Sequence, residues 1–135
     1  MGGRHVKKAY RVKKDQDFQR VFHQGRSVAN RQLVLYVYPK PGQAHYRIGL
    51  SVGKKIGNAV ERNFIKRRLR SAVQAIGPAI QPEFDFLLIA RQDIKNKTYP
   101  QLQKSIIHVM NLMNILDQEI LANLQGGRHD KTKNE

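Results

Sequence analysis

Residues 54–70 concentrate cationic side chains in a spacing that suits contact with phosphate groups. Seven of these seventeen residues are Lys or Arg, and Glu61 is the only acid. A helix would place four polar residues along one face, because they recur at i, i+3, i+4 and i+7. They are Asn63, Lys66, Arg67 and Arg70. Like charges at these spacings repel, so this is either an ordinary solvated helix face or a surface neutralised by nucleic-acid phosphates.

The residues beside this face extend its cationic character. Lys54 and Lys55 come directly before the expected helix, whose N-terminus attracts anions. Gly57 permits backbone geometry that a larger residue would resist. Arg62 lies at the edge of the apolar stripe of the helix. Because the whole chain carries a net charge of +15, we favour nucleic-acid binding over a solvated face.

Carboxylates and histidines offer little for catalysis by the protein. Metal-dependent hydrolysis of a phosphodiester typically needs clustered carboxylates, and the ten acids of this chain are scattered. Glu83 and Asp85 could share one strand face, where a metal role and a strand-edge role are both open. The five histidines lack ligand spacing, and no serine–histidine arrangement indicates a triad. We therefore assign no catalytic and no metal-binding residue.

Composition limits the remaining classes of protein. A chain of 135 residues predicts one domain with a hydrophobic core. The absence of cysteine excludes disulfides and thiolate metal sites. No apolar segment is long enough to span a membrane, and no signal peptide is evident. We expect a cytoplasmic protein with no membrane partner and no evident protein partner.

Hydrophobic periodicity predicts the elements that would position these side chains. We expect helices at 14–23, 58–76 and 98–120 and strands at 31–38, 45–52 and 84–91. The first two strands flank a Pro- and Gly-containing turn, which predicts an antiparallel hairpin. The domain would span residues 14–122, between a flexible basic arm at 1–13 and a disordered polar tail at 123–135.

The cationic segment carries a longer pattern that continues into its flanks. The pattern K-x-G-x-A-V-x-R-N-x-x-K-R is formed by Lys55, Gly57, Ala59, Val60, Arg62, Asn63, Lys66 and Arg67. It resembles the RNR motif of the bacterial ribonuclease P protein component family. The helix with Asp17-Phe18 and Val21-Phe22 and the strands at 47–52 and 85–91 also resemble that family, in the same order. The resemblance covers residues 7–116.

This resemblance implies a specific fold. It is an α/β (α+β) two-layer sandwich in the order αβββαβα, with helices packed on a four-stranded sheet. Periodicity alone predicts three strands, and a short strand near residues 26–28 would supply the fourth. The family also implies an unusual left-handed βαβ crossover, although such crossovers are right-handed in nearly all proteins.

The resemblance further implies an auxiliary role in tRNA 5′ processing. A catalytic RNA subunit, with the Mg²⁺ that it requires, would hold the active site, and the protein alone would be inactive. The protein would bind that RNA and the single-stranded 5′ leader of precursor tRNA, and so assist removal of the leader. Four basic residues of the arm would become ordered only on RNA. They are Lys7, Lys8, Arg11 and Lys13.

The same resemblance assigns two groups of binding residues. The RNA-binding group, from the RNR motif, comprises Lys54, Lys55, Arg62, Asn63, Lys66, Arg67 and Arg70. The leader-binding cleft comprises Phe18, Phe22, Tyr36 and Ser51. Its aromatic rings would stack on bases, or else they belong to the core. Two other functions fit the residue types: a ribosomal or RNA-chaperone protein, and an autonomous metal-dependent nuclease built on Glu83 and Asp85.

Overall fold

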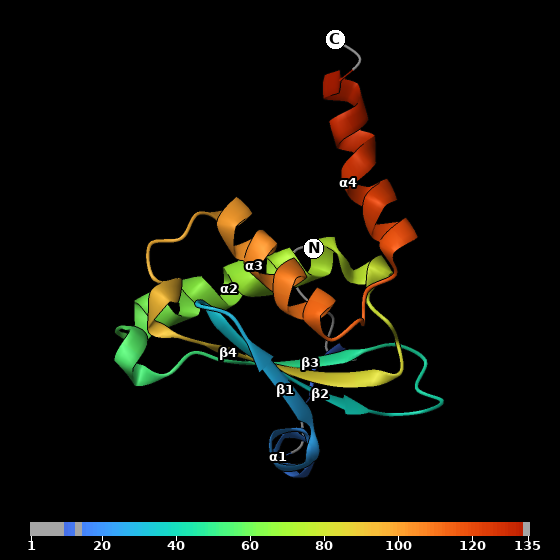
Figure 1. Ribbon diagram of the computed structural model, residues 1–135. Coiled ribbons are helices and arrows are strands. Elements are labelled where there is room, and N and C mark those ends of the chain that lie inside the picture. Colours follow the sequence, from blue (N-terminus) through green and yellow to red (C-terminus); the bar gives the residue numbers. More distant parts are fainter. Residues whose placement is uncertain (1–9, 13–14, 134–135) are drawn as a thin grey trace.

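A mixed four-stranded sheet forms the centre of the protein (Figure 1). The computed structural model describes residues 10–12 and 15–133, of which 126–133 by their backbone alone. The strands are β1 (Arg26–Ala29), β2 (Leu33–Pro39), β3 (Arg47–Ser51) and β4 (Phe84–Ala90). Their order across the sheet is β1-β2-β4-β3. Only the pair of β3 with β4 is parallel.

The expected hairpin between residues 31–38 and 45–52 is wrong, because β4 lies between these two strands. The sequence of β4 explains its central position. Its residues 85–88 are all buried, and a strand that is apolar on both faces belongs in the interior of a sheet. Strand β2 pairs instead with β1 across a short turn, so the expected fourth strand near residues 26–28 is present.

Two helices cover one face of the sheet and a third crosses the other face (Figure 1). Helix α3 (Tyr99–Leu112) packs against β1, β2 and the neighbouring α2 (Ala59–Ala75), with Leu69 and Ile106 fully buried in the core. Helix α1 (Asp15–Gln24) lies on the opposite face and buries Val21. The fold is therefore α+β, with helices on both faces of the sheet.

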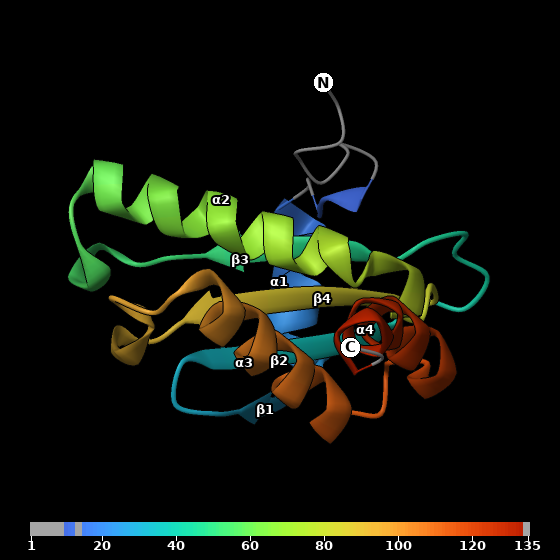
Figure 2. The same ribbon diagram turned by 90° about the horizontal axis from the view of Figure 1, so that it is seen from above.

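The connection from β3 through α2 to β4 joins two neighbouring parallel strands. Figure 2 looks down onto α2, and when the parallel strands are turned to point upward, β4 lies to the left of β3. The crossover is thus left-handed, as the family resemblance implied, against the strong general preference for right-handed crossovers.

The expected helix at 98–120 is divided into two in the structure. Asn114 has a φ of 56°, a left-handed conformation that ends α3. Leu116 then pairs with Ile80 as an isolated antiparallel bridge before α4 (Gln118–Lys133) begins. Helix α4 projects away from the sheet (Figure 1) and continues through Lys133, so residues 123–133 of the expected disordered tail are helical, while residues 134–135 lie outside the described residues.

Part of the expected basic arm lies against the sheet. Arg11 forms a parallel bridge with Ile48 of β3, and the ring of Tyr10 stacks on His45 with centroids 3.9 Å apart. For residues 10–12, the structure therefore differs from the expected flexible arm. Lys7, Lys8 and Lys13 lie outside the described residues.

Gly25 joins α1 to the sheet where the two backbones approach closely. A Cβ atom at this position would lie 2.5 Å from the carbonyl oxygen of Val21 and 2.8 Å from that of Val37. Only glycine fits this approach, which fixes α1 against the sheet. Among the described residues, no helix combines the length and hydropathy that crossing a membrane requires.

Candidate nucleic-acid interface

The cations of residues 54–70 have no acidic partner in the part of the chain that the structure describes. Its ion pairs belong to Arg20, Arg47 and Lys97, which contact Asp17, Asp85 or Asp93. Asn63 and Arg67 are exposed on α2, as are Lys54 and Lys55 in the 3-10 turn η3 (Lys54–Ile56) before it. Arg62, Lys66 and Arg70 are half-buried. The result is a helix surface whose positive charge is not neutralised by the described part of the protein.

Glu61, the only acid of this segment, serves the start of the helix. Its carboxylate accepts a hydrogen bond from the backbone of Asn58 at 2.8 Å, and the Asn58 side chain accepts one from the Glu61 backbone at 2.9 Å. This capping box satisfies the first free amides of α2. A Cβ at Gly57 would collide with the Glu61 carboxylate, which explains the glycine there without any backbone strain.

Two guanidinium nitrogens near α2 have no hydrogen-bond partner among the residues that the structure describes. The Nε atoms of Arg62 and Arg11 are covered but make no hydrogen bond among the described residues. Partial burial, and then the nearby charge of Arg11, lower the pKa of Arg70. Two guanidiniums near each other, without an acid, form a local site that favours an anion.

Strand register gathers the predicted cleft residues on one face of the sheet, the face that α1 partly covers. Tyr36 lies opposite Leu87, which in turn lies opposite Gly49, and Ser51 lies on this same face two residues further along β3. Tyr36 and Ser51 are both half-buried. The predicted residues on β2 and β3 therefore share a surface, although β4 separates their strands.

The aromatic residues of α1 lie over this face. Phe22 is 40% exposed, and its ring centroid lies 5.1 Å from that of Tyr36. Phe18 is half-buried against Gly49, where an added Cβ would meet the ring at 3.4 Å. Neither ring is sealed in the core, so both retain surface that a base could contact.

A hollow of about 160 Å³ lies between Phe18, one of these aromatic residues, and the cationic helix. Phe18 lines it from α1, Arg70 from α2, and Arg11 from the chain before α1. From the sequence, these three residues belong to separate predicted groups: the cleft, the RNA-binding helix and the basic arm. Only the packing of the arm along the edge of β3 brings them together.

The suspected carboxylate pair does not form a shared site. Asp85 is buried and accepts two hydrogen bonds from Arg47, at 3.0 Å from Nε and 2.6 Å from Nη2. Donating these hydrogen bonds to Asp85 raises the pKa of Arg47. Glu83 is exposed and precedes β4. Within the described residues, no group of three or more His, Cys, Asp or Glu side chains could hold a metal ion.

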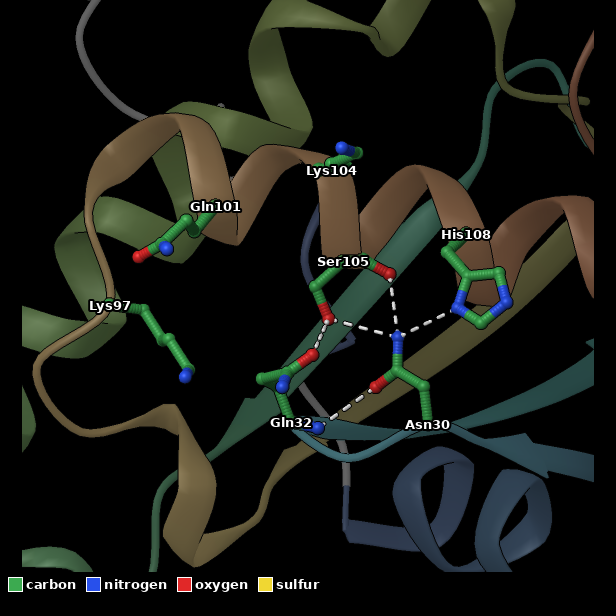
Figure 3. Close-up of a pocket in the computed structure, with 7 residues that line it drawn as sticks. All are labelled: Asn30, Gln32, Lys97, Gln101, Lys104, Ser105 and His108. Carbon is green, nitrogen blue, oxygen red and sulfur yellow. Dashed lines mark hydrogen bonds between the residues drawn. The ribbon is translucent and has the colours of Figure 1, made fainter.

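A polar hollow of about 560 Å³, which was not predicted from the sequence, lies between the β1–β2 turn and α3 (Figure 3). Asn30 accepts hydrogen bonds from the backbone of Gln32 and Leu33, so its Nδ2 donates to Ser105 Oγ at 2.9 Å and to His108 Nδ1 at 3.2 Å. These contacts fasten the turn to α3. They join residues 75 and 78 positions apart, and no local spacing signals them.

Comparison with known proteins identifies the family. The model of the family Ribonuclease P matches residues 6–114. The ribonuclease P protein component of Enterococcus faecalis is 49% identical over 112 residues, which is 83% of this chain and 95% of that protein. That of Lactiplantibacillus plantarum is 46% identical over 114 residues, covering 84% of this chain and all (100%) of the relative.

Solved structures agree with these sequence matches. The RNase P protein of Staphylococcus aureus superimposes with a TM-score of 0.74 at 45% identity, covering 81% of this chain and 99% of that one. The RNase P protein of Thermotoga maritima gives a TM-score of 0.68 at 25% identity, covering 80% of this chain and 96% of that one. The cationic helix, the aromatic sheet face and these matches together show that the chain belongs to the ribonuclease P protein family.

Proposed function

We propose that this protein binds the catalytic RNA subunit of ribonuclease P and the single-stranded 5′ leader of precursor tRNA. In this role it assists the removal of the leader in the cytoplasm, which produces the mature 5′ end of tRNA. The RNA subunit and its Mg²⁺ carry out the hydrolysis. The protein supplies binding and orientation but no catalytic residue and no metal site.

The observation that supports this proposal best is the unneutralised charge of α2. Seven cations within residues 54–70 form no ion pair among the described residues. Self-repulsion at helical spacing destabilises such a surface, and binding a polyanion with release of its counterions relieves the repulsion. RNA is the polyanion that the family of this chain handles.

Binding of the leader is assigned to the aromatic face of the sheet. Phe22 and Tyr36 offer partly exposed rings for stacking, which suits unpaired bases. Ser51 would contribute a hydroxyl on the same face. The hollow lined by Phe18, Arg11 and Arg70 would hold a phosphate between the leader surface and α2.

Reconstitution tests the division of labour. A bacterial ribonuclease P RNA made by transcription is combined with this protein, Mg²⁺ and a precursor tRNA that carries a 5′ leader. We expect a single cut at the mature 5′ end, enhanced by the protein at limiting Mg²⁺, and no cut by the protein alone. Cleavage of this substrate without the RNA, or no effect of the protein on cleavage, would contradict the proposal.

The leader assignment needs its own comparison. The protein should tighten binding of a precursor with a long leader much more than binding of mature tRNA. Phe22→Ala should remove much of that difference, whereas Leu112→Ala, which changes a 50% exposed side chain on α3, should leave it intact. If both variants kept the same preference for the long-leader precursor, the leader would bind at a surface other than that of Phe22.

The description of one relative raises a second activity. A solved structure of the Staphylococcus aureus protein, 45% identical to this chain, is described as a mutant with defective mRNA degradation activity. The paired state of Asp85 argues against a carboxylate-based nuclease site here. The reconstitution therefore includes an mRNA with the protein alone, and degradation there would contradict a purely auxiliary role. Recovery of ribosomal RNA from cells with the protein would instead favour the ribosomal or chaperone alternative.

A further inference from the structure

The first half of α2 exposes apolar surface that the fold does not use. Val60 is 78% exposed and Phe64 is 47% exposed, and their separation of four residues places them on one face. Exposed apolar side chains that adjoin one another and are bordered by polar residues often mark an interaction site. These two residues lie within the cationic segment, on α2, the green helix of Figure 2.

One face of the Phe64 ring already has a cation against it. The guanidinium carbon of Arg68 lies 4.9 Å from the ring centroid, which is a cation–π contact. The ring nevertheless remains half exposed, so Arg68 leaves part of it free. This contact orders the aromatic side chain in advance and lowers the entropy lost when a flat ligand stacks on it.

Hollows lie on two sides of Phe64. One, of about 390 Å³, is lined by Val60, Asn63 and Arg67 as well as Phe64. The other, of about 400 Å³, extends from Phe64 and Arg68 to the loop before α3, where it includes Lys95. Each hollow is within the range of small-ligand sites, and each combines an apolar wall with at least one cation.

We propose that Phe64 is a stacking platform for an unpaired base of the partner RNA, with Arg67 and Arg68 binding the adjoining phosphates. This inference rests on the RNA binding proposed above and assigns it a specific nucleotide contact. Charge favours RNA over a protein as the occupant, because Arg67, Arg68 and Lys95 line these hollows against one acid, Glu61, which is held by its cap. Stacking uses the flat ring, and the flanking cations match the backbone of a nucleic acid.

Substitution of Phe64 separates stacking from charge. Phe64→Leu keeps an apolar side chain and the helix but removes the aromatic face, so affinity for a transcribed ribonuclease P RNA should fall roughly 5- to 150-fold. The salt dependence of binding should stay unchanged, because no cation is lost. Leu112→Ala on α3 is the matched control and should bind as the parent protein does. Parent-like affinity of Phe64→Leu would overturn the platform.

A fluorescent variant reports the contact directly. The chain contains no Trp, so Phe64→Trp introduces a single indole at the proposed platform. Its emission should be quenched when the ribonuclease P RNA is added, because a base stacks on the indole. Inorganic polyphosphate, a polyanion without bases, should occupy the cations without this quenching. Unchanged emission at saturating RNA, or equal quenching by polyphosphate, would overturn the inference.

The outcomes distinguish this inference from the proposed function. Failure of the parent protein to bind the RNA would refute the proposed function itself. Tight binding by the parent with no effect of either Phe64 variant would refute only the platform.

Discussion

Acids and cations near the candidate interface differ in whether they already have partners among the described residues. Asp85 is buried in two hydrogen bonds to Arg47, and the Glu61 carboxylate caps α2. The guanidinium of Arg67 and the covered Nε of Arg62 have no such partner among the described residues. The acids therefore stabilise the fold, while the cations remain available to bind another molecule.

Removing one cation should separate binding from stability. Arg67 is exposed on α2, so Arg67→Ala should weaken RNA binding about tenfold. The slope of log affinity against log salt concentration should become less negative by about 0.7, because one phosphate contact is lost. Its unfolding free energy should stay within about 0.5 kcal/mol of the parent value. The measurements are RNA titrations at several salt concentrations and chemical denaturation.

Lys104→Ala provides the charge-matched control for that experiment. Lys104 is exposed on α3 beside the hollow of Figure 3 rather than on α2. Losing one charge there should change RNA affinity much less. Equal losses in the two variants would mean that total charge, not the α2 surface, governs binding.

Tyr46 should make stability fall at alkaline pH. Burial, and then Tyr10, raise the pKa of Tyr46 to about 12 from an ordinary value of 10.0. The folded state therefore keeps the phenol neutral while the unfolded chain ionises it. The contribution of the neutral Tyr46 phenol to the unfolding free energy is complete below pH 10. It is lost as the pH rises toward 12, which lowers the unfolding free energy by roughly 2 kcal/mol.

Chemical denaturation of the parent protein and of Tyr46→Phe between pH 9 and about 12 measures this effect. The variant keeps the ring but cannot ionise, so its stability should decline less steeply with pH. Parallel curves for the two proteins would show that the phenol of Tyr46 ionises freely in the folded state.

Side-chain chemistry was the part of the site that the sequence could predict. A run of Lys and Arg at helical spacing has the same chemistry wherever the helix lies, so the α2 surface follows from residue type. The hollow formed by Phe18, Arg11 and Arg70 does not, because tertiary packing alone joins its three segments. The network of Asn30 with Ser105 was missed for the same reason.

At the scale of elements, periodicity predicted three of the four strands and most helices, but it did not predict which strands are neighbours in the sheet. Alternation in 33–37 and the apolar run of 86–90 both identify strands. Pairing depends on which faces must be buried across the whole sheet, so the local turn after β2 suggested the wrong partner. Likewise, one left-handed residue, Asn114, divides an apolar stripe that looks continuous in sequence.

The capping box should contribute measurably to the stability of α2. Asn58→Ala removes the side chain that accepts from the Glu61 backbone, which should lower the unfolding free energy by about 1 kcal/mol. Asn63→Ala, an exposed change inside the same helix, should leave stability unchanged or slightly higher, because Ala favours helix more than Asn. Thermal and chemical denaturation of both variants test this, and an equal loss in both would argue against the cap.

At the scale of the whole molecule, the net charge of +15 should govern how binding depends on salt. If about five cations contact a single strand, log affinity should fall with log salt concentration at a slope of roughly −3 to −4. Filter binding or fluorescence titration of a precursor tRNA leader across salt concentrations measures the slope. A flat response would contradict the α2 surface as the contact.

The position of β4 has a consequence for how the protein is made. This strand fills the gap between β2 and β3, yet it is the last of the four to leave the ribosome. Until about residue 90 has emerged, a nascent chain holds strands whose hydrogen-bonding edges have no neighbour. The sheet therefore closes late in translation, when one incoming segment joins two halves that cannot meet without it.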